Sequence, residues 1–127
     1  ALKLRNAQMS GCIINMSSIM GTFGRPGNVP YSTAKAAILG FTRSLAHEVA
    51  PRNIRVNAIA PGYFATEING DFWSTPPGIK MVQGIPFGRI GKLNELDGPL
   101  LLLASDAGAF MTGSVLTVDG GHILPFG

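Results

Sequence analysis

The sequence predicts an α/β fold in which helices cover both faces of a parallel sheet, a three-layer, doubly wound arrangement. Short apolar runs alternate along the chain with helical segments, and this alternation implies parallel strands joined by right-handed crossovers. The 127 residues are 46% hydrophobic and only 13% charged, a balance suited to central strands that are buried on both faces. One domain with a modest core is therefore expected.

Three short runs are expected to be strands: residues 12–16, 54–60 and 114–118. Each is apolar or rich in β-branched side chains, and turn-forming residues follow each one directly. The residues that follow are Ser17-Ser18, Pro61-Gly62 and Asp119-Gly120-Gly121. Ligands of open parallel sheets bind beyond the carboxyl ends of the strands, so we expect these residues along one edge.

The spacing of apolar residues predicts a long helix over residues 31–50, which residues 51–53 end. The apolar residues recur at steps of three or four and form one face, comprising Ala34, Ile38, Phe41, Leu45 and Val49. A shorter helix is predicted over residues 94–104, with Asn94 as its N-cap. Pro99 is expected to remove one backbone hydrogen bond from it.

Residues 66–91 lack clear periodicity and are crowded with glycine and proline. A segment of this length inside a compact domain is more often a lid or binding loop than a linker, so we expect it to be the substrate loop. Phe72 and Trp73 within it would serve equally well in a substrate lid or as an anchor at a subunit interface. Residues 24–30 are also expected to be a loop.

The start of the chain resembles the end of an element. Residues 1–9 are predicted to be the last turns of a helix that Gly11 terminates. Because the chain opens with Ala rather than Met, we expect that part of the protein precedes it.

Charge and cysteine content argue against several classes of function. The formal net charge of +3 comes from ten scattered basic residues with no adjacent pair, unlike a nucleic-acid surface. The longest apolar stretch, residues 100–104, is too short to cross a membrane, and no signal peptide is recognisable. Cys12 is expected to be a buried thiol, and no metal site is expected. A cytoplasmic protein fits these features.

Tyr31 and Lys35 lie four residues apart on the predicted long helix, so their side chains share one face a turn apart. A phenol is a weak base at neutral pH because its pKa is about 10, and a nearby ammonium lowers that pKa. Lowering it by two to three pH units corresponds to about 3–4 kcal/mol. Ser18 could hydrogen-bond the oxygen whose proton Tyr31 exchanges. Alternatively, Tyr31 is a helix-start aromatic and Lys35 a solvated charge.

Several motifs resemble, in order and spacing, those of the short-chain dehydrogenase/reductase family, and the match covers nearly the whole chain. The motifs are residues 11–18 (GCIINMSS), 31–37 (YSTAKAA), 55–62 (RVNAIAPG), 88–91 (GRIG), 103–106 (LASD) and 112–121 (TGSVLTVDGG). They resemble the compact, single-domain (classical) type. Agreement of several spaced motifs is more specific than the Tyr31 and Lys35 pair alone.

The resemblance implies a catalytic role for three matching residues. Tyr31 corresponds to the general acid/base that exchanges a proton with the substrate oxygen. Lys35 corresponds to the residue that holds the nicotinamide ribose and lowers the pKa of Tyr31. Ser18, thirteen residues before Tyr31, corresponds to the hydroxyl that orients the substrate carbonyl or alcohol.

The resemblance also implies a segment that binds the cofactor, NAD or NADP. Pro61, Gly62 and Phe64 resemble the residues that pass the nicotinamide ring, although simple packing is an equal alternative for Phe64. Thr66 resembles the hydroxyl near the amide or phosphates of the cofactor. The implied fold is the carboxyl-terminal half of one Rossmann-like NAD(P)-binding domain, residues 1–127. The glycine-rich phosphate loop, the residue that selects NAD or NADP and the catalytic Asn would lie in an amino-terminal half absent here.

The implied function is hydride transfer between NAD(P) and an alcohol/carbonyl pair, with a polyol, sugar or 3-oxoacyl compound as the small-molecule substrate. A homodimer or homotetramer is implied for the full-length protein, with the long helix and the last strand at interfaces, and neither nucleic acid nor membrane as a partner. Two alternatives stay open. One is an extended-type epimerase or dehydratase, which the short distance from Tyr31 to residues 119–121 disfavours. The other is an inactive truncated product that serves only in assembly.

Overall fold

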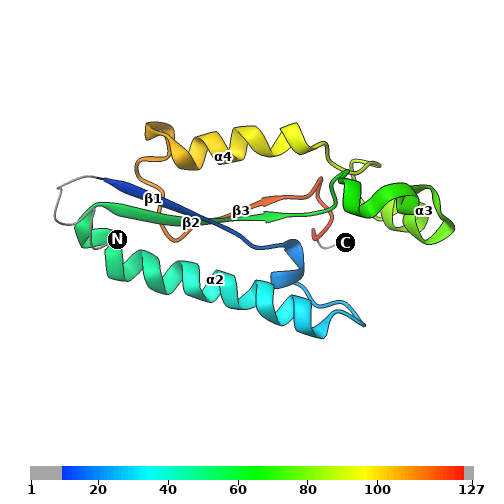
Figure 1. Ribbon diagram of the computed structural model, residues 1–127, viewed down its shortest axis with the longest axis horizontal. Helices are drawn as coiled ribbons and strands as arrows, with labels where there is room; N and C mark the ends of the chain where they lie inside the picture. The colour runs from blue at the N-terminus through cyan, green and yellow to red at the C-terminus, as the bar shows by residue number, and fades with distance from the viewer. Residues whose placement is uncertain (1–9, 125–127) are drawn as a thin grey trace.

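The computed structural model of the protein describes residues 10–124. Three parallel strands form one sheet in the order β1-β2-β3, with helices on both faces (Figure 1). The elements, in which η denotes a 3-10 helix, are β1 (Gly11–Met16), η1 (Ile19–Gly21), α2 (Val29–Val49), η2 (Ala50–Arg52), β2 (Ile54–Pro61), η3 (Glu67–Ser74), α3 (Pro76–Gln83), η4 (Leu93–Leu96), α4 (Asp97–Ala104), η5 (Asp106–Gly108) and β3 (Val115–Val118).

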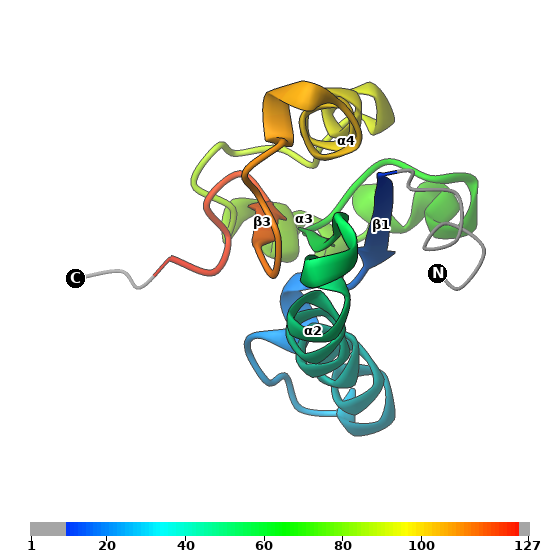
Figure 2. The same cartoon turned by 90° about the vertical axis from the view of Figure 1, so that its left-hand side faces the viewer.

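The molecule has three layers. Helix α2 lies on one face of the sheet and α4 on the other, and the view turned by 90° shows the strands between them (Figure 2). Helix α2 packs mainly against the central strand β2, while α4 packs against β1 and β2. This arrangement confirms the predicted α/β fold with a doubly wound parallel sheet.

The strands lie where the sequence predicted them, with small differences at their ends. Gly11 begins β1, one residue before the predicted strand, and pairs with Ile54 of β2. Its backbone N–H donates to the carbonyl oxygen of Asn53 at 3.1 Å, so the backbone of Gly11 is hydrogen-bonded as part of the sheet. The predicted helix of residues 1–9 lies outside the described residues.

The buried face of α2 is rotated relative to the predicted one and shares Val49 with it. The buried residues are Leu39, Thr42, Ala46 and Val49. Phe41 of the predicted face is 55% exposed, and Ala34 is exposed too. A polar contact explains this rotation, because the Asn15 side-chain amide in β1 donates to the Thr42 hydroxyl at 2.9 Å. The small side chains of Thr42 and Ala46 also let the helix approach the sheet closely.

The core between α2 and β2 is aliphatic, and one buried amide interrupts it. Ala46, Val49, Ile54 and Val56 form the aliphatic cluster. Asn57 in β2 has no exposed surface. Its amide nitrogen donates to the carbonyl oxygen of Met111 at 2.8 Å, and its amide oxygen accepts from the N–H of Ser114 at 3.0 Å. Asn57 therefore joins the central strand to the segment that leads into β3, with its polar atoms satisfied.

The prediction of a loop over residues 66–91 was wrong in part, since η3 and α3 lie within it. Helix α3 begins at Pro76-Pro77, and the Thr75 hydroxyl accepts from the N–H of Gly78 at 3.3 Å as its N-cap. Proline at the start of a helix fits because its fixed φ is helical and no partner is needed there for its missing N–H. The two prolines that suggested a loop thus begin a helix.

The helical region near residue 94 is correct, but its predicted cap is not. A 3-10 turn, η4, precedes α4, and its N-cap is Lys92 instead of Asn94. The backbone N–H of Lys92 donates to the carboxylate of Glu95 at 2.7 Å. Pro99 lies in the first turn of α4, where its missing N–H costs no helical hydrogen bond.

Cys12 is exposed, which corrects the expectation of a buried thiol. Its Sγ donates to the carbonyl oxygen of Leu103 in α4 at 3.2 Å. The reason lies in the sheet order: among the described strands, β1 has a neighbour on one side only, so its side chains are less covered than those of β2.

Candidate active site

The carboxyl ends of the strands meet at one edge of the sheet, as predicted. The backbone N–H of Ser17, just after β1, donates to the carbonyl oxygen of Ile59 in β2 at 2.8 Å. The backbone N–H of Gly62, just after β2, donates to the carbonyl oxygen of Val118 in β3 at 2.9 Å. The segments that follow the three strands therefore start side by side at the carboxyl edge of the sheet, where open α/β sheets bind ligands.

Ser18 is buried, with 8% of its surface exposed, and forms the N-cap of η1. Its hydroxyl oxygen accepts a hydrogen bond from the N–H of Met20 at 3.2 Å. Because this bond uses only a lone pair of the oxygen, the hydroxyl hydrogen remains able to donate to a ligand. The neighbouring Ser17 hydroxyl instead donates to the backbone carbonyl of Lys35 at 2.8 Å.

Tyr31 and Lys35 lie in the first turns of α2, facing the end of β1. The Lys35 ammonium is 5.6 Å from the centroid of the Tyr31 ring, a cation–π distance. The same ammonium donates to the carbonyl oxygen of Met16, the last residue of β1, at 3.1 Å. Tyr31 is 49% exposed. The helical spacing thus brings this pair together as predicted, with the ammonium held between the ring and the strand end.

Ser18 and Tyr31 line one cavity of about 310 Å³. Its other lining residues are Ile19, Met20, Arg25, Asn28, Gly62 and Tyr63. The walls therefore come from η1, the loop before α2, the start of α2 and the segment after β2. Lys35 lies beside the Tyr31 ring and does not itself line the cavity.

Arg25 joins the loop before α2 to the segment after β2. Its Nη1 donates to the hydroxyl of Tyr63 at 2.8 Å and lies 3.7 Å from the sulfur of Met81 in α3. The Tyr63 ring meets Trp73 edge-on at a centroid distance of 5.5 Å, and His122 at 5.1 Å. These aromatic contacts fix the Tyr63 ring, and through it the position of the guanidinium.

The segment predicted to bind the cofactor divides between two places. Pro61 ends β2, and Gly62 lines the cavity of Ser18 and Tyr31. Phe64 is only 7% exposed and packs on Gly91, where a Cβ would come within 2.5 Å of the Phe64 ring. This contact favours the packing alternative for Phe64. Thr66 is half-buried and precedes η3 as its N-cap.

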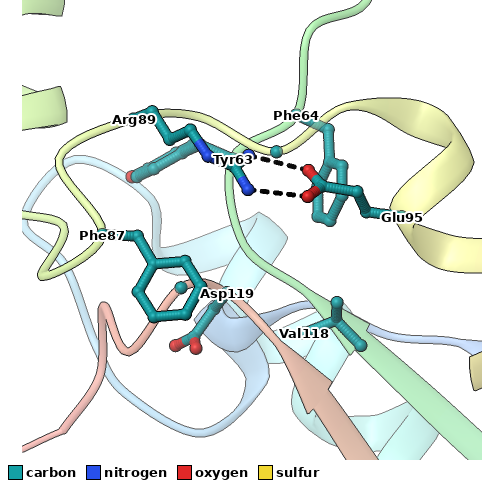
Figure 3. Close-up of a pocket in the computed structure, with 9 residues that line it drawn as sticks. Tyr63, Phe64, Phe87, Arg89, Glu95, Val118 and Asp119 are labelled. Carbon is teal, nitrogen blue, oxygen red and sulfur yellow. Dashed lines mark hydrogen bonds and ion pairs between the residues drawn. The ribbon is translucent and has the colours of Figure 1, made fainter.

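Phe64 belongs to a second, smaller cavity of about 90 Å³ (Figure 3). Beside it, Arg89 and Glu95 form a two-pronged ion pair, with nitrogen–oxygen distances of 2.7 and 2.8 Å. The hydrogen bonds from Arg89 and from the Lys92 backbone lower the pKa of Glu95 to about 2, and Glu95 raises the pKa of Arg89. The two charges satisfy each other, so neither side chain of this pair is available as a general acid or base.

Motif spacing did not identify Arg25 or Tyr63 as cavity residues. Arg25 lies in a segment that its glycines and prolines marked only as a loop, and the path of a loop across a site depends on tertiary contacts. For Tyr63 a usable signal existed, because it directly follows Pro61-Gly62 at a strand end.

Among residues 10–124, no group of three or more His, Cys, Asp or Glu side chains could hold a metal ion. Over the same residues, no helix combines the length and the apolar character needed to cross a membrane.

Residues 1–122 match a protein-family model described as enoyl-(acyl carrier protein) reductase. The chain belongs to the short-chain dehydrogenase/reductase family, in its classical type.

Its relatives include enzymes with different substrates. It is 46% identical over 112 residues to the 3-oxoacyl-(acyl-carrier-protein) reductase of Chlamydia trachomatis, covering 88% of this chain and 45% of the relative. The gluconate 5-dehydrogenase of Burkholderia cenocepacia, solved with NADP and tartrate, matches with a TM-score of 0.91 and 32% identity over 98% of this chain and 49% of that one. A 4-hydroxyisoleucine dehydrogenase solved with NADH gives a TM-score of 0.93, 29% identity and coverages of 98% and 52%. The chain spans about half the length of the curated relatives it matches.

Proposed function

We propose that this chain supplies the proton-transfer half of an NAD(P)-dependent oxidoreductase that interconverts an alcohol and a ketone or aldehyde. Ser18, Tyr31 and Lys35 are the proposed catalytic residues. The observation that carries the proposal is the cavity that Ser18 and Tyr31 line together, with the Lys35 ammonium beside the Tyr31 ring. Family membership and the enzymes among its relatives support the same reaction class.

In the reducing direction, Tyr31 donates its hydroxyl proton to the substrate carbonyl oxygen. Ser18 donates a second hydrogen bond to that oxygen. Its hydroxyl hydrogen is available for this, because the bond from the N–H of Met20 uses only a lone pair of the Ser18 oxygen. Two donors at one oxygen stabilise the negative charge that develops there during reduction. In the oxidising direction, Tyr31 accepts the proton of the alcohol.

Lys35 stabilises the phenolate that remains on Tyr31 after the proton has left. The ammonium has three N–H donors, and in the described chain its hydrogen bond is to the carbonyl oxygen of Met16. Two donors therefore remain for other acceptors, such as the hydroxyls of a ribose. The bond to Met16 keeps the charge near the ring while those donors are engaged.

The residues at this edge fit a nicotinamide cofactor. The remaining donors of Lys35 suit its ribose, and the half-buried Pro61 and Gly62 lie at the strand end beside the cavity. Thr66 adds a hydroxyl a few residues further on. A nicotinamide bound here would supply or accept the hydride at the substrate carbon. Both NAD and NADP are compatible with these contacts.

We also propose that the full-length protein is a homodimer or homotetramer. Apolar side chains are exposed on α2 and near α4, including Phe41, Leu101 and Phe110. Large exposed apolar side chains of this kind are typical of surfaces that another subunit covers. The cytoplasmic location expected from the sequence stays a prediction.

A chimaera tests the catalytic proposal. In it, this chain replaces the matching carboxyl-terminal half of the C. trachomatis reductase, and the variant carries Tyr31→Phe. Loss of the transferable proton is expected to lower kcat by about 10²- to 10⁴-fold while the affinity for NADH and NADPH is unchanged. Rates are compared with the unsubstituted chimaera, and cofactor affinity is measured by fluorescence titration. Normal turnover by the Tyr31→Phe variant would refute the role of Tyr31.

A further inference from the structure

We infer that Arg25 determines specificity by binding a carboxylate of the substrate, so that the protein acts on small hydroxy or oxo acids in preference to neutral alcohols and ketones. The inference rests on the proposed function, because Arg25 lines the same cavity as Ser18 and Tyr31.

The charge of this cavity comes from Arg25. Its other lining residues, given above, carry no formal charge. Within residues 10–124, the ion pair is between Arg89 and Glu95, and no Asp or Glu oxygen lies within 4 Å of a side-chain nitrogen of Arg25. A cation on a cavity wall without a carboxylate partner attracts anionic ligands.

The guanidinium is oriented before any ligand binds. One of its five N–H donors points to the Tyr63 hydroxyl at 2.8 Å. Tyr63 in turn is held between Trp73 and His122. A planar guanidinium held at one nitrogen keeps its other donors for the two oxygens of a carboxylate, the acceptor group that matches its geometry. Such preorganisation lowers the entropic cost of binding.

Neighbouring titratable groups do not pair with Arg25. Burial lowers the pKa of His122, while Asp119 raises it and Arg25 lowers it, so the net pKa shift is downward and favours the neutral imidazole. The Asp119 carboxylate accepts from the backbone N–H groups of Gly121 and Ile123 at 2.8 and 3.0 Å. It does not line the cavity. A substrate entering the cavity at neutral pH therefore meets the positive charge of Arg25.

The size of the cavity favours a short substrate. Its volume of about 310 Å³ is at the lower end of the usual range for ligand pockets, roughly 300–1,000 Å³. Arg25 and Tyr31 line the same cavity, so one short substrate can place its carboxylate at Arg25 and its reacting group at Tyr31. A short hydroxy or oxo acid meets both requirements.

Binding to the chain itself is the first test. The chain is titrated with sodium gluconate and with sorbitol, which has a hydroxymethyl group in place of the carboxylate, at constant ionic strength and with calorimetric detection. We expect gluconate to bind more tightly than sorbitol, and Arg25→Gln to weaken gluconate by roughly 10- to 100-fold without affecting sorbitol. Arg25→Lys should retain part of the preference, and Arg43→Gln, which removes a charge outside the cavity, should retain all of it. Equal affinities for the two compounds, or no effect of Arg25→Gln, overturn the inference.

Turnover by the chimaera separates this inference from the proposed function. It is assayed with 3-oxobutanoate and with the neutral methyl ester of that acid. We expect a higher kcat/KM for the acid than for the ester, and we expect Arg25→Gln to remove that difference by raising KM for the acid. Turnover of acid and ester at equal kcat/KM overturns the inference and leaves the proposed function intact. No turnover of either compound, with gluconate discrimination retained by the chain, refutes the proposed function and supports the carboxylate site.

Discussion

Gly21 lies directly against the backbone of Lys35. A Cβ at position 21 would stand 2.8 Å from both the carbonyl carbon and the carbonyl oxygen of Lys35, which is too close for any real contact. The Ser17 hydroxyl donates to that same oxygen at 2.8 Å. Because these contacts are to helix backbone, which cannot swing aside as a side chain can, they fix Ser18 relative to the start of α2.

We therefore expect Gly21→Ala to push η1 away from α2. Overpacking against backbone should cost about 1–3 kcal/mol of unfolding free energy. The displacement of Ser18 from Tyr31 should lower kcat of the chimaera by roughly 10²-fold, because catalysis is sensitive to misplacement by about 1 Å. Gly24→Ala is the matched control, since a Cβ there has no atom within 4 Å. Equal stability and activity of the two variants would show that the contact does not set the geometry.

Asn57→Ala should destabilise the protein through its hydrogen bonds rather than through lost volume. It leaves the carbonyl oxygen of Met111 and the N–H of Ser114 without their partner in a buried place. We expect a loss of about 2–4 kcal/mol in the free energy of unfolding, measured by urea denaturation. Asn94→Ala, at an exposed position, should change it by less than about 0.5 kcal/mol. A loss below 1 kcal/mol for Asn57→Ala would mean that water replaces the amide.

The Arg89 and Glu95 ion pair predicts a pH-dependent difference between the original chain and Glu95→Gln. The pKa of Glu95 falls from 4.5 to about 2 on folding, so its stabilising contribution is present above pH 4.5 and is lost as pH falls toward 2. We expect Glu95→Gln to unfold at lower urea concentration than the original chain at pH 7, with the two midpoints converging between pH 4.5 and pH 2.

Salt and a partner variant provide the controls for that measurement. Both side chains are on the surface, so added salt should shrink the difference at pH 7. Arg89→Gln should lower the urea midpoint as Glu95→Gln does. The double variant should lower it little further than either single variant. A midpoint difference that persists unchanged to pH 2 would assign the effect of Glu95→Gln to packing.

Local pattern predicted the strands, the long helix and the approach of Lys35 to Tyr31. The strands are short β-branched runs followed by turn residues, and the spacing of Tyr31 and Lys35 translates directly into one helical face. Rotation of α2 was not predictable in this way, because the Asn15 to Thr42 bond joins residues 27 positions apart. Arg25 was missed for a related reason, since its partner Tyr63 is 38 positions away.

The single tryptophan of the chain, Trp73, touches the ring that anchors Arg25. Its indole meets Tyr63 edge-on, and Tyr63 lines the cavity. Any ligand that draws the guanidinium away from the Tyr63 hydroxyl alters the surroundings of this indole. Its ultraviolet emission is thus a label-free optical reporter of the bond between Arg25 and Tyr63, free of interference from a second indole within the chain.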